Sequence, residues 1–127
     1  MIVLDTSVAV AGLTGHPAAR QIMTGGPLTA PAHIDVEVAH TLRGLVMGGK
    51  LPTAAATRLI ALWRTVELER VSMAPMLPRI WELRDNLTCY DAAFVALAES
   101  LSISLVTADR RLARAPGLLC VVHVVEP

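Results

Sequence analysis

The sequence has few aromatic residues, two cysteines and no long apolar run, and each scarcity narrows the class of protein. Only 3% of the 127 residues are aromatic although 54% are hydrophobic, so the core must consist of small aliphatic side chains, as in parallel sheets covered by helices. Cys89 and Cys120 match no metal-binding spacing, and we expect free thiols in a reducing cytoplasm. No apolar run approaches the roughly 18 residues of a membrane span, and Asp5 interrupts the stretch that a signal peptide would need. We therefore expect a cytoplasmic protein without a membrane segment.

The charge composition is balanced and dominated by arginine. The formal net charge is zero, so no overall positive field indicates a nucleic-acid partner. Lys50 is the only lysine, so nearly all cations carry the planar guanidinium that suits phosphate. The length fits one domain over residues 1–127. The high apolar content favours a hydrophobic interface with a second copy or another protein.

Short β-rich segments alternate with helical segments along the chain. Apolar spacing and breakers such as Gly25-Gly26-Pro27 and Gly48-Gly49 predict helices over 7–13, 16–24, 31–47, 53–65, 75–85, 88–101 and 110–114. Strands are expected over 1–5, 28–30, 68–72, 103–106 and 119–125. Thr53 is the expected N-cap of its helix. The alternation predicts a three-layer α/β/α sandwich with a central, mainly parallel sheet.

Two aspartates follow apolar strands. Asp5 ends the first strand, and Asp109 comes three residues after the strand over 103–106. Either could simply cap the helix that follows. However, both strands are apolar throughout and should be central, and ligands of open α/β sheets bind beyond the carboxyl ends of the strands. The two carboxylates are therefore expected to converge in one pocket.

Two further acids lie on helices. Thr88 and Asp91 have the spacing of a capping box, but Asp91 also shares a helix face with Phe94, where a carboxylate needs a partner. On the other helix Asp35 falls inside the apolar arc and Glu37 falls outside it, so helical phase alone favours Asp35. Carboxylates about 4 Å apart repel by roughly 4 kcal/mol at an effective dielectric near 20, so such a cluster needs protons or cations. Hard oxygen ligands favour Mg²⁺, or Mn²⁺ in its place.

Four segments together resemble one known family. The chain contains VLDTSV, PAHIDVEVAHTL, LTCYDAAFVALAE and LVTADRRL in this order. It resembles the PIN-domain ribonucleases, and among them the VapC-like toxins of bacterial type II toxin-antitoxin systems, over essentially its whole length. The resemblance implies that Asp5, Glu37, Asp91 and Asp109 form the catalytic and metal-binding site. It places the supporting hydroxyls at two threonines, Thr6 and Thr107, and leaves Asp35 as a helix-start residue.

The resemblance also implies an activity and partners. It implies a PIN-like homodimer that cleaves RNA with Mg²⁺ and a metal-activated water. It also implies that a cognate antitoxin inhibits this homodimer. From their positions beside the site-bearing segments, the candidates for phosphate contacts are Arg43, Arg84, Arg110 and Arg111, with ordinary solvated helix faces as the alternative. The histidines and the two tryptophans are expected in surface, packing or interface roles.

Two other functions stay open from the residues. A non-catalytic binding module could use the same fold to hold a partner. An Asp-based phosphotransfer domain also places Asp at the end of its first strand, but it would want an Asp-x-Asp pattern or a late lysine. Here Asp5 is followed by Thr6 and Ser7, and Lys50 lies in a loop after a helix.

Overall fold

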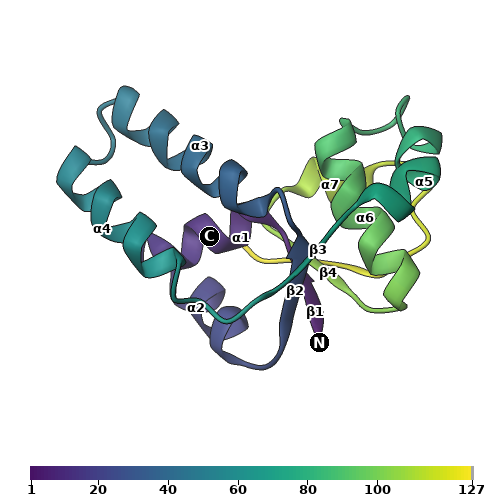
Figure 1. Cartoon of the computed structure of the whole chain (residues 1–127), viewed down its shortest axis with the longest axis horizontal. Coiled ribbons are helices and arrows are strands. Elements are labelled where there is room, and N and C mark those ends of the chain that lie inside the picture. Colours follow the sequence, from purple (N-terminus) through teal and green to yellow (C-terminus); the bar gives the residue numbers. More distant parts are fainter. Residues whose placement is uncertain (127) are drawn as a thin grey trace.

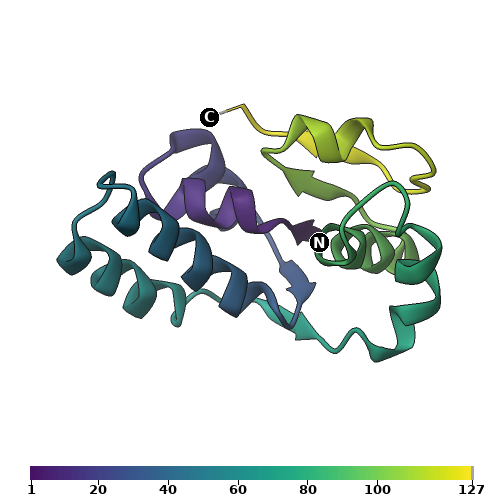
Figure 2. The same ribbon diagram turned by 90° about the horizontal axis from the view of Figure 1, so that it is seen from above.

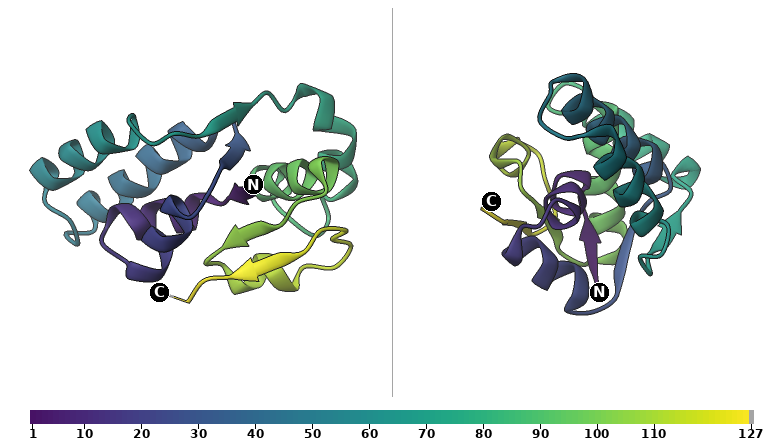
Figure 3. Two further views of the ribbon diagram at one scale, coloured as in Figure 1. Left: turned by 90° about the horizontal axis from the view of Figure 1, so that it is seen from below. Right: turned by 90° about the vertical axis from the view of Figure 1, so that its left-hand side faces the viewer.

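A five-stranded parallel sheet forms the centre of the protein, as the computed structural model of residues 1–126 shows (Figure 1). The strand order is β3-β2-β1-β4-β5, and every neighbouring pair is parallel. The strands are β1 (Ile2–Leu4), β2 (Leu28–Pro31), β3 (Glu69–Val71), β4 (Leu105–Thr107) and β5 (Val122–Val124). Figure 3 shows β4 and β5 side by side, at the edge opposite β3. As predicted, the strands that lead to Asp5 and Asp109 are interior.

Helices cover the sheet on both sides. The first group is α1 (Thr6–Leu13), α2 (Pro17–Thr24), α3 (Ile34–Met47) and α4 (Thr53–Trp63), and the second is α5 (Leu77–Glu82), α6 (Cys89–Leu101) and α7 (Arg110–Arg114). The first group lies on one side of the sheet and the second on the other (Figure 1). Seen from above, α3 and α4 form an antiparallel pair at the end of the molecule away from α5 and α6 (Figure 2). The predicted three-layer α/β/α sandwich is confirmed.

The core is aliphatic, as the shortage of aromatic residues requires. Val3 and Leu4 of β1 and Leu105 of β4 are fully buried. Helix α6 packs against β1, β2 and β4, and its residues from Ala92 to Ala98 are all buried. Four of these seven residues are alanine, and Phe94 is the only aromatic one, so small side chains make up most of the buried part of the helix.

Several predicted boundaries were wrong for local reasons. The helix predicted from Pro31 begins at Ile34, because Pro31 still belongs to β2. The expected N-cap Thr53 is the first helical residue, and Pro52 precedes it without a side-chain cap. The helix predicted over 75–85 is a 3₁₀ turn (Ala74–Met76) followed by α5, since proline cannot donate the backbone bonds of a helix interior.

The C-terminal strand is shorter than the sequence predicted. Strand β5 covers only part of the predicted 119–125, so Cys120 precedes the strand and its predicted strand position was wrong. Cys89 and Cys120 are both free, as expected. Within residues 1–126 no helix is both long and apolar enough to cross a membrane. The predicted domain 1–127 includes Pro127, which lies outside the described residues.

Candidate active site

Asp5 lies where β1 passes into α1 and is held by both helix and sheet. It is only 5% exposed. Its Oδ2 accepts a hydrogen bond from the backbone N–H of Ser7 at 3.2 Å, so Asp5 is the N-cap of α1. The same oxygen accepts bonds from the Ser7 hydroxyl and from the Thr107 hydroxyl, the latter at 2.9 Å. Because these bonds all use Oδ2, Oδ1 is the oxygen left for another partner.

Thr107 connects Asp5 to Asp109. Strands β1 and β4 are in parallel register, with Val3 opposite Leu105, so their carboxyl ends meet. The buried Thr107 hydroxyl donates to Asp5 and accepts from the backbone N–H of Asp109 at 3.0 Å. Asp109 in turn caps α7, because its Oδ1 accepts from the backbone N–H of Arg111 at 2.9 Å. The capping interpretation of both aspartates is therefore correct, and it coexists with their convergence.

Glu37 reaches the same region from α3. Its Oε2 accepts from the Thr6 hydroxyl at 2.7 Å, which ties α3 to the start of α1. Its Oε1 lies 3.0 Å from Nε2 of His33, one helical turn earlier. The two atoms are close enough for an ion pair, but the angles between them are not those of a hydrogen bond. Both atoms are buried, and neither has a hydrogen-bond partner among the described residues. A buried carboxylate oxygen without a donor is available to a cation.

Asp91 lies in the first turn of α6, where its carboxyl group is half-buried and feels the charges of the other three acids. Burial raises the pKa of Asp91, and repulsion from the charges of Asp5, Asp109 and Glu37 raises it further, against a smaller opposing effect of Thr88. The Thr88 hydroxyl accepts from the backbone N–H of Asp91 at 3.1 Å, so the predicted N-cap is present. The charges of Asp5, Asp109 and Glu37 thus reach Asp91, and Asp5 and Asp109 are linked directly through Thr107.

The donor set fits a hard divalent cation, with one restriction. Among residues 1–126 no three His, Cys, Asp or Glu side chains are arranged to hold one ion between them. Mg²⁺, however, usually keeps several waters and is bound through one or two carboxylates. The four oxygen-bearing side chains therefore match the chemistry of Mg²⁺ or Mn²⁺, without defining three direct protein ligands.

Asp35, which helical phase alone favoured, lies in a different environment. Its carboxylate accepts from Trp63 Nε1 at 2.7 Å and from Arg70 Nε and Nη2 at 2.7 and 3.0 Å. The bonds from Arg70 hold the pKa of Asp35 below its usual range, against the opposing effect of burial. Asp35 therefore joins α3 to α4 and β3, while Glu37 on the same helix contacts Thr6 of α1. The choice of Glu37, made from the resemblance, agrees with this geometry.

The four arginines proposed for phosphate contacts occupy different places. Arg111 is the one beside the acids, with Nε 3.7 Å from Asp109 Oδ1, and its side chain is 93% exposed. Arg110 pairs with Glu126. Arg84 lies over the Trp81 ring at 4.6 Å, and Arg43 borders a hollow between α3 and α4. Their phosphate contacts stay predictions, and the geometry favours Arg111 among them.

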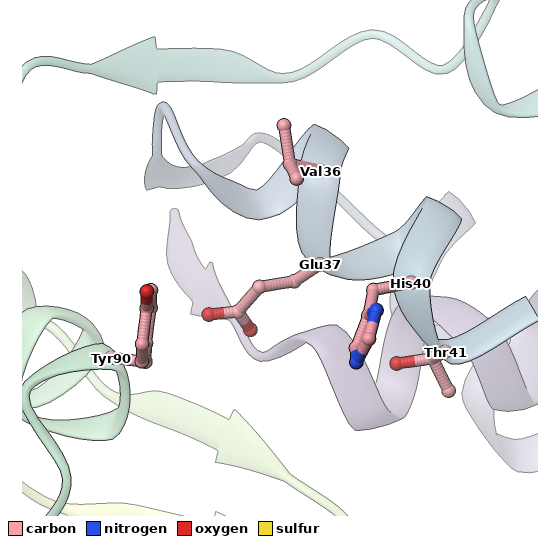
Figure 4. Close-up of a pocket in the computed structure, with 5 residues that line it drawn as sticks. All are labelled: Val36, Glu37, His40, Thr41 and Tyr90. Atoms are coloured by element: carbon pink, nitrogen blue, oxygen red, sulfur yellow. The ribbon is translucent and has the colours of Figure 1, made fainter. Parts of the chain in front are cut away.

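Sequence reasoning missed a hollow next to the acids. It has a volume of about 540 Å³ and is lined by Val36, Glu37, His40, Thr41 and Tyr90 (Figure 4). The histidines of this segment were assigned to surface or interface roles, yet His33 contacts Glu37 and His40 lines the hollow. The available signal was spacing, because His33 and Glu37 are four residues apart on one helix face.

Comparison with known proteins identifies the family. The PIN domain profile matches residues 2–118. The chain therefore belongs to the PIN-domain family.

Within that family the chain is VapC-like. It is 41% identical over 125 residues to ribonuclease VapC9 of Mycobacterium tuberculosis, with 98% of each chain covered. It is 35% identical over 129 residues to ribonuclease VapC1 of the same organism, covering 98% of this chain and 97% of the relative.

Solved structures agree in fold. The toxin-antitoxin complex from Klebsiella pneumoniae contains a chain with a TM-score of 0.70 and 18% identity, with 100% of both chains covered. VapBC2 from Rickettsia felis, bound to a DNA fragment from its promoter, contains one with a TM-score of 0.68 and 16% identity, covering 97% and 98%. At these identities the likeness concerns the fold alone.

Proposed function

We propose that the protein is a metal-dependent endoribonuclease that acts as the toxin of a toxin-antitoxin pair. The observation that carries this proposal is the link through the Thr107 hydroxyl between Asp5 and Asp109, with Glu37 bonded to Thr6, the residue next to Asp5. The 41% identity to a ribonuclease over nearly the whole chain supports the choice of RNA as substrate.

Each acid has a role in this proposal. Asp5, Asp91, Asp109 and Glu37 would hold Mg²⁺ or Mn²⁺, directly or through waters, and the bound cation would supply charge neutralisation at the phosphate and acidify a water molecule. Hydrolysis adds the water oxygen to phosphorus and releases the 3′ oxygen as a hydroxyl. Burial and the charges of the other acids raise the pKa of Asp91, so protons and cations should compete there.

The hydroxyl groups around the site would serve as positioning groups. Ser7 and Thr107 fix Asp5 through Oδ2, and Thr6 fixes Glu37 through Oε2. One oxygen of each carboxylate is therefore occupied by the protein, and the other is available. Such orientation by neighbouring hydrogen bonds is typical of metal-binding carboxylates.

The proposed partners are RNA, a cognate antitoxin and a second copy of the chain. The structural neighbours from Rickettsia felis and Klebsiella pneumoniae come from toxin-antitoxin assemblies, and this supports an antitoxin as partner. The homodimer and the cytoplasmic location stay predictions from the sequence.

The decisive experiment is an RNA cleavage assay with matched variants. Purified protein is incubated with mixed single-stranded RNA and Mg²⁺ or Mn²⁺, then with chelator, and the assay is repeated with Asp5→Asn. We expect metal-dependent cleavage that falls at least about 100-fold in the variant, the order of loss seen when one electrostatic group of an active site is removed. Asp85→Asn, at an exposed position, is the matched control and should cleave normally.

Other outcomes would point to the other functions. Binding of RNA without turnover in either metal would favour a non-catalytic module. A stable acyl-phosphate on Asp5 would favour phosphotransfer. Cleavage that survives both the chelator and Asp5→Asn would contradict the proposed site.

A further inference from the structure

The hollow beside Glu37 lies between α3 and the start of α6. The Glu37 carboxylate belongs both to its lining and to the candidate active site. Figure 4 shows Glu37 extending from α3 toward Tyr90, with His40 and Thr41 further along the same helix. The volume of about 540 Å³ lies within the roughly 300–1,000 Å³ of small-molecule pockets. Any group bound here is therefore next to whatever the four acids bind.

Tyr90 presents an exposed aromatic ring to this hollow. It is the only tyrosine of the chain and is 67% exposed. Its ring meets the edge of the His33 ring at 5.8 Å, and His33 in turn meets the fully buried Phe94 at 5.4 Å. His33 thus lies between Tyr90 and the core, and the rest of the tyrosine ring is open to a ligand.

The remaining lining suits a flat, neutral group with hydrogen-bonding edges. Val36 is 73% exposed and adds apolar surface, while His40 and Thr41 add side chains that can donate or accept. Within the described chain no lysine or arginine lines the hollow, so it lacks the cations of a phosphate site. A nucleobase has this combination of aromatic face and polar edge.

We propose that this hollow binds a nucleobase of single-stranded RNA next to the scissile phosphate, stacked on Tyr90, with His40 and Thr41 reading its edge. The proposal rests on the proposed function, because it takes the four acids as the site of cleavage. It goes beyond that function by assigning a subsite that selects the nucleotide. Base stacking on aromatic side chains is the usual basis of single-strand binding.

The test measures stacking separately from cleavage. Short single-stranded RNAs carry 2-aminopurine at one position each, and their binding to Asp5→Asn protein is followed by fluorescence. We expect quenching at one position, retained with Tyr90→Phe and lost with Tyr90→Leu. Affinity should fall about 5- to 150-fold in Tyr90→Leu, the loss that corresponds to one base–aromatic stack.

Trp81 provides the matched control. It is also exposed, at 63%, but it is covered by Arg84 and does not line the hollow. Trp81→Leu should therefore leave both quenching and affinity unchanged. If Tyr90→Leu binds and quenches like its parent while wild-type protein cleaves RNA, the base subsite is refuted and a protein side chain becomes the better occupant.

A second measurement uses the unaltered side chain. RNA containing 5-iodouracil is irradiated in complex with the protein, and the crosslinked peptides are identified by mass spectrometry. A crosslink at Tyr90 supports the proposal, and crosslinks only at other residues overturn it. Absence of RNA cleavage by wild-type protein would instead refute the proposed function, and the Tyr90 quenching result would still stand.

Discussion

The Thr107 hydroxyl offers the sharpest test of how the acids are held together, through the substitution Thr107→Val. The side chain is fully buried at the end of β4. Valine replaces the hydroxyl by a methyl group of similar size, so no cavity forms, but both hydrogen bonds are lost. The change therefore isolates the hydrogen bonds that link Asp5 to Asp109.

The expected cost follows from two bonds. The Thr107 hydroxyl donates to the Asp5 carboxylate at 2.9 Å and accepts from the Asp109 backbone N–H at 3.0 Å. A hydrogen bond to a charged group contributes about 1.5–3 kcal/mol and a neutral one about 0.5–1.5 kcal/mol. Because Ser7 still donates to Asp5, we expect a loss of about 2–4 kcal/mol in the free energy of unfolding.

The matched control is Thr29→Val. Thr29 is also fully buried in an interior strand, but its hydroxyl donates to a backbone carbonyl, Glu69 O, at 3.0 Å. This neutral bond should be worth about 0.5–1.5 kcal/mol. Both variants are compared with wild type by urea denaturation in the presence of chelator, and by RNA cleavage at saturating Mg²⁺.

The two variants should differ in both assays. Thr107→Val should lose more stability than Thr29→Val, and it alone should lose cleavage activity, since Asp5 is no longer oriented from β4. Equal destabilisation by the two substitutions, or full cleavage activity in Thr107→Val, would refute the reasoning that Thr107 positions the acids.

Three further predictions concern charged side chains. Asp91→Asn should abolish cleavage yet raise the melting temperature of metal-free protein by about 4 °C, a gain of roughly 1 kcal/mol. Because the pKa of Asp91 is raised from 3.8, this gain in stability should be present at neutral pH and vanish below about pH 3.8. Thermal melts at a series of pH values measure it, and a gain that does not change with pH would contradict the prediction. Asp35→Asn should cost roughly 1 kcal/mol at pH 7 and leave cleavage intact, whereas Glu37→Gln should abolish cleavage. Because the pKa of Asp35 is lowered, its contribution to the free energy of unfolding is lost as the pH falls through that pKa. If Asp35→Asn and Glu37→Gln cleave RNA equally well, Glu37 does not belong to the site. Arg79→Met removes two bonds to Glu99, at 2.7 and 3.1 Å, and one each to Glu82 and the Gly117 carbonyl. It should cost about 2–3 kcal/mol by urea denaturation, and unchanged stability would show that these bonds of Arg79 contribute nothing.

Much of the fold could be predicted because its signals are local. The apolar strand before Asp5, the helix over 88–101 and its N-cap Thr88 all follow from short-range pattern, and the structure has them. The boundaries near proline were harder. Pro31 could start a helix or end a strand, and only its pairing with Val71 in β3 places it in the sheet.

The candidate site was predictable to a different degree at each residue. Asp5 and Asp109 follow from their places at the ends of two apolar strands, since parallel neighbours bring their carboxyl ends together. Glu37 did not follow from helical phase, which favoured Asp35, and needed the resemblance to the PIN-domain family. Phase placed Asp35 on the buried side, yet the side chain of Asp35 is 42% exposed and that of Glu37 only 24%, because Glu37 contacts Thr6 of α1.

The sequence by itself determined the aliphatic α/β architecture, because hydrophobic period and breakers act over a few residues. It also determined which carboxylates are present at element ends. Only the tertiary structure decided which of them meet, that Thr107 reaches Asp5 across 102 residues and links it to Asp109, and that His33 and Tyr90 border Glu37. The reason is physical: such contacts depend on strand order and helix packing, and these are set by burial across the whole chain rather than by any one segment.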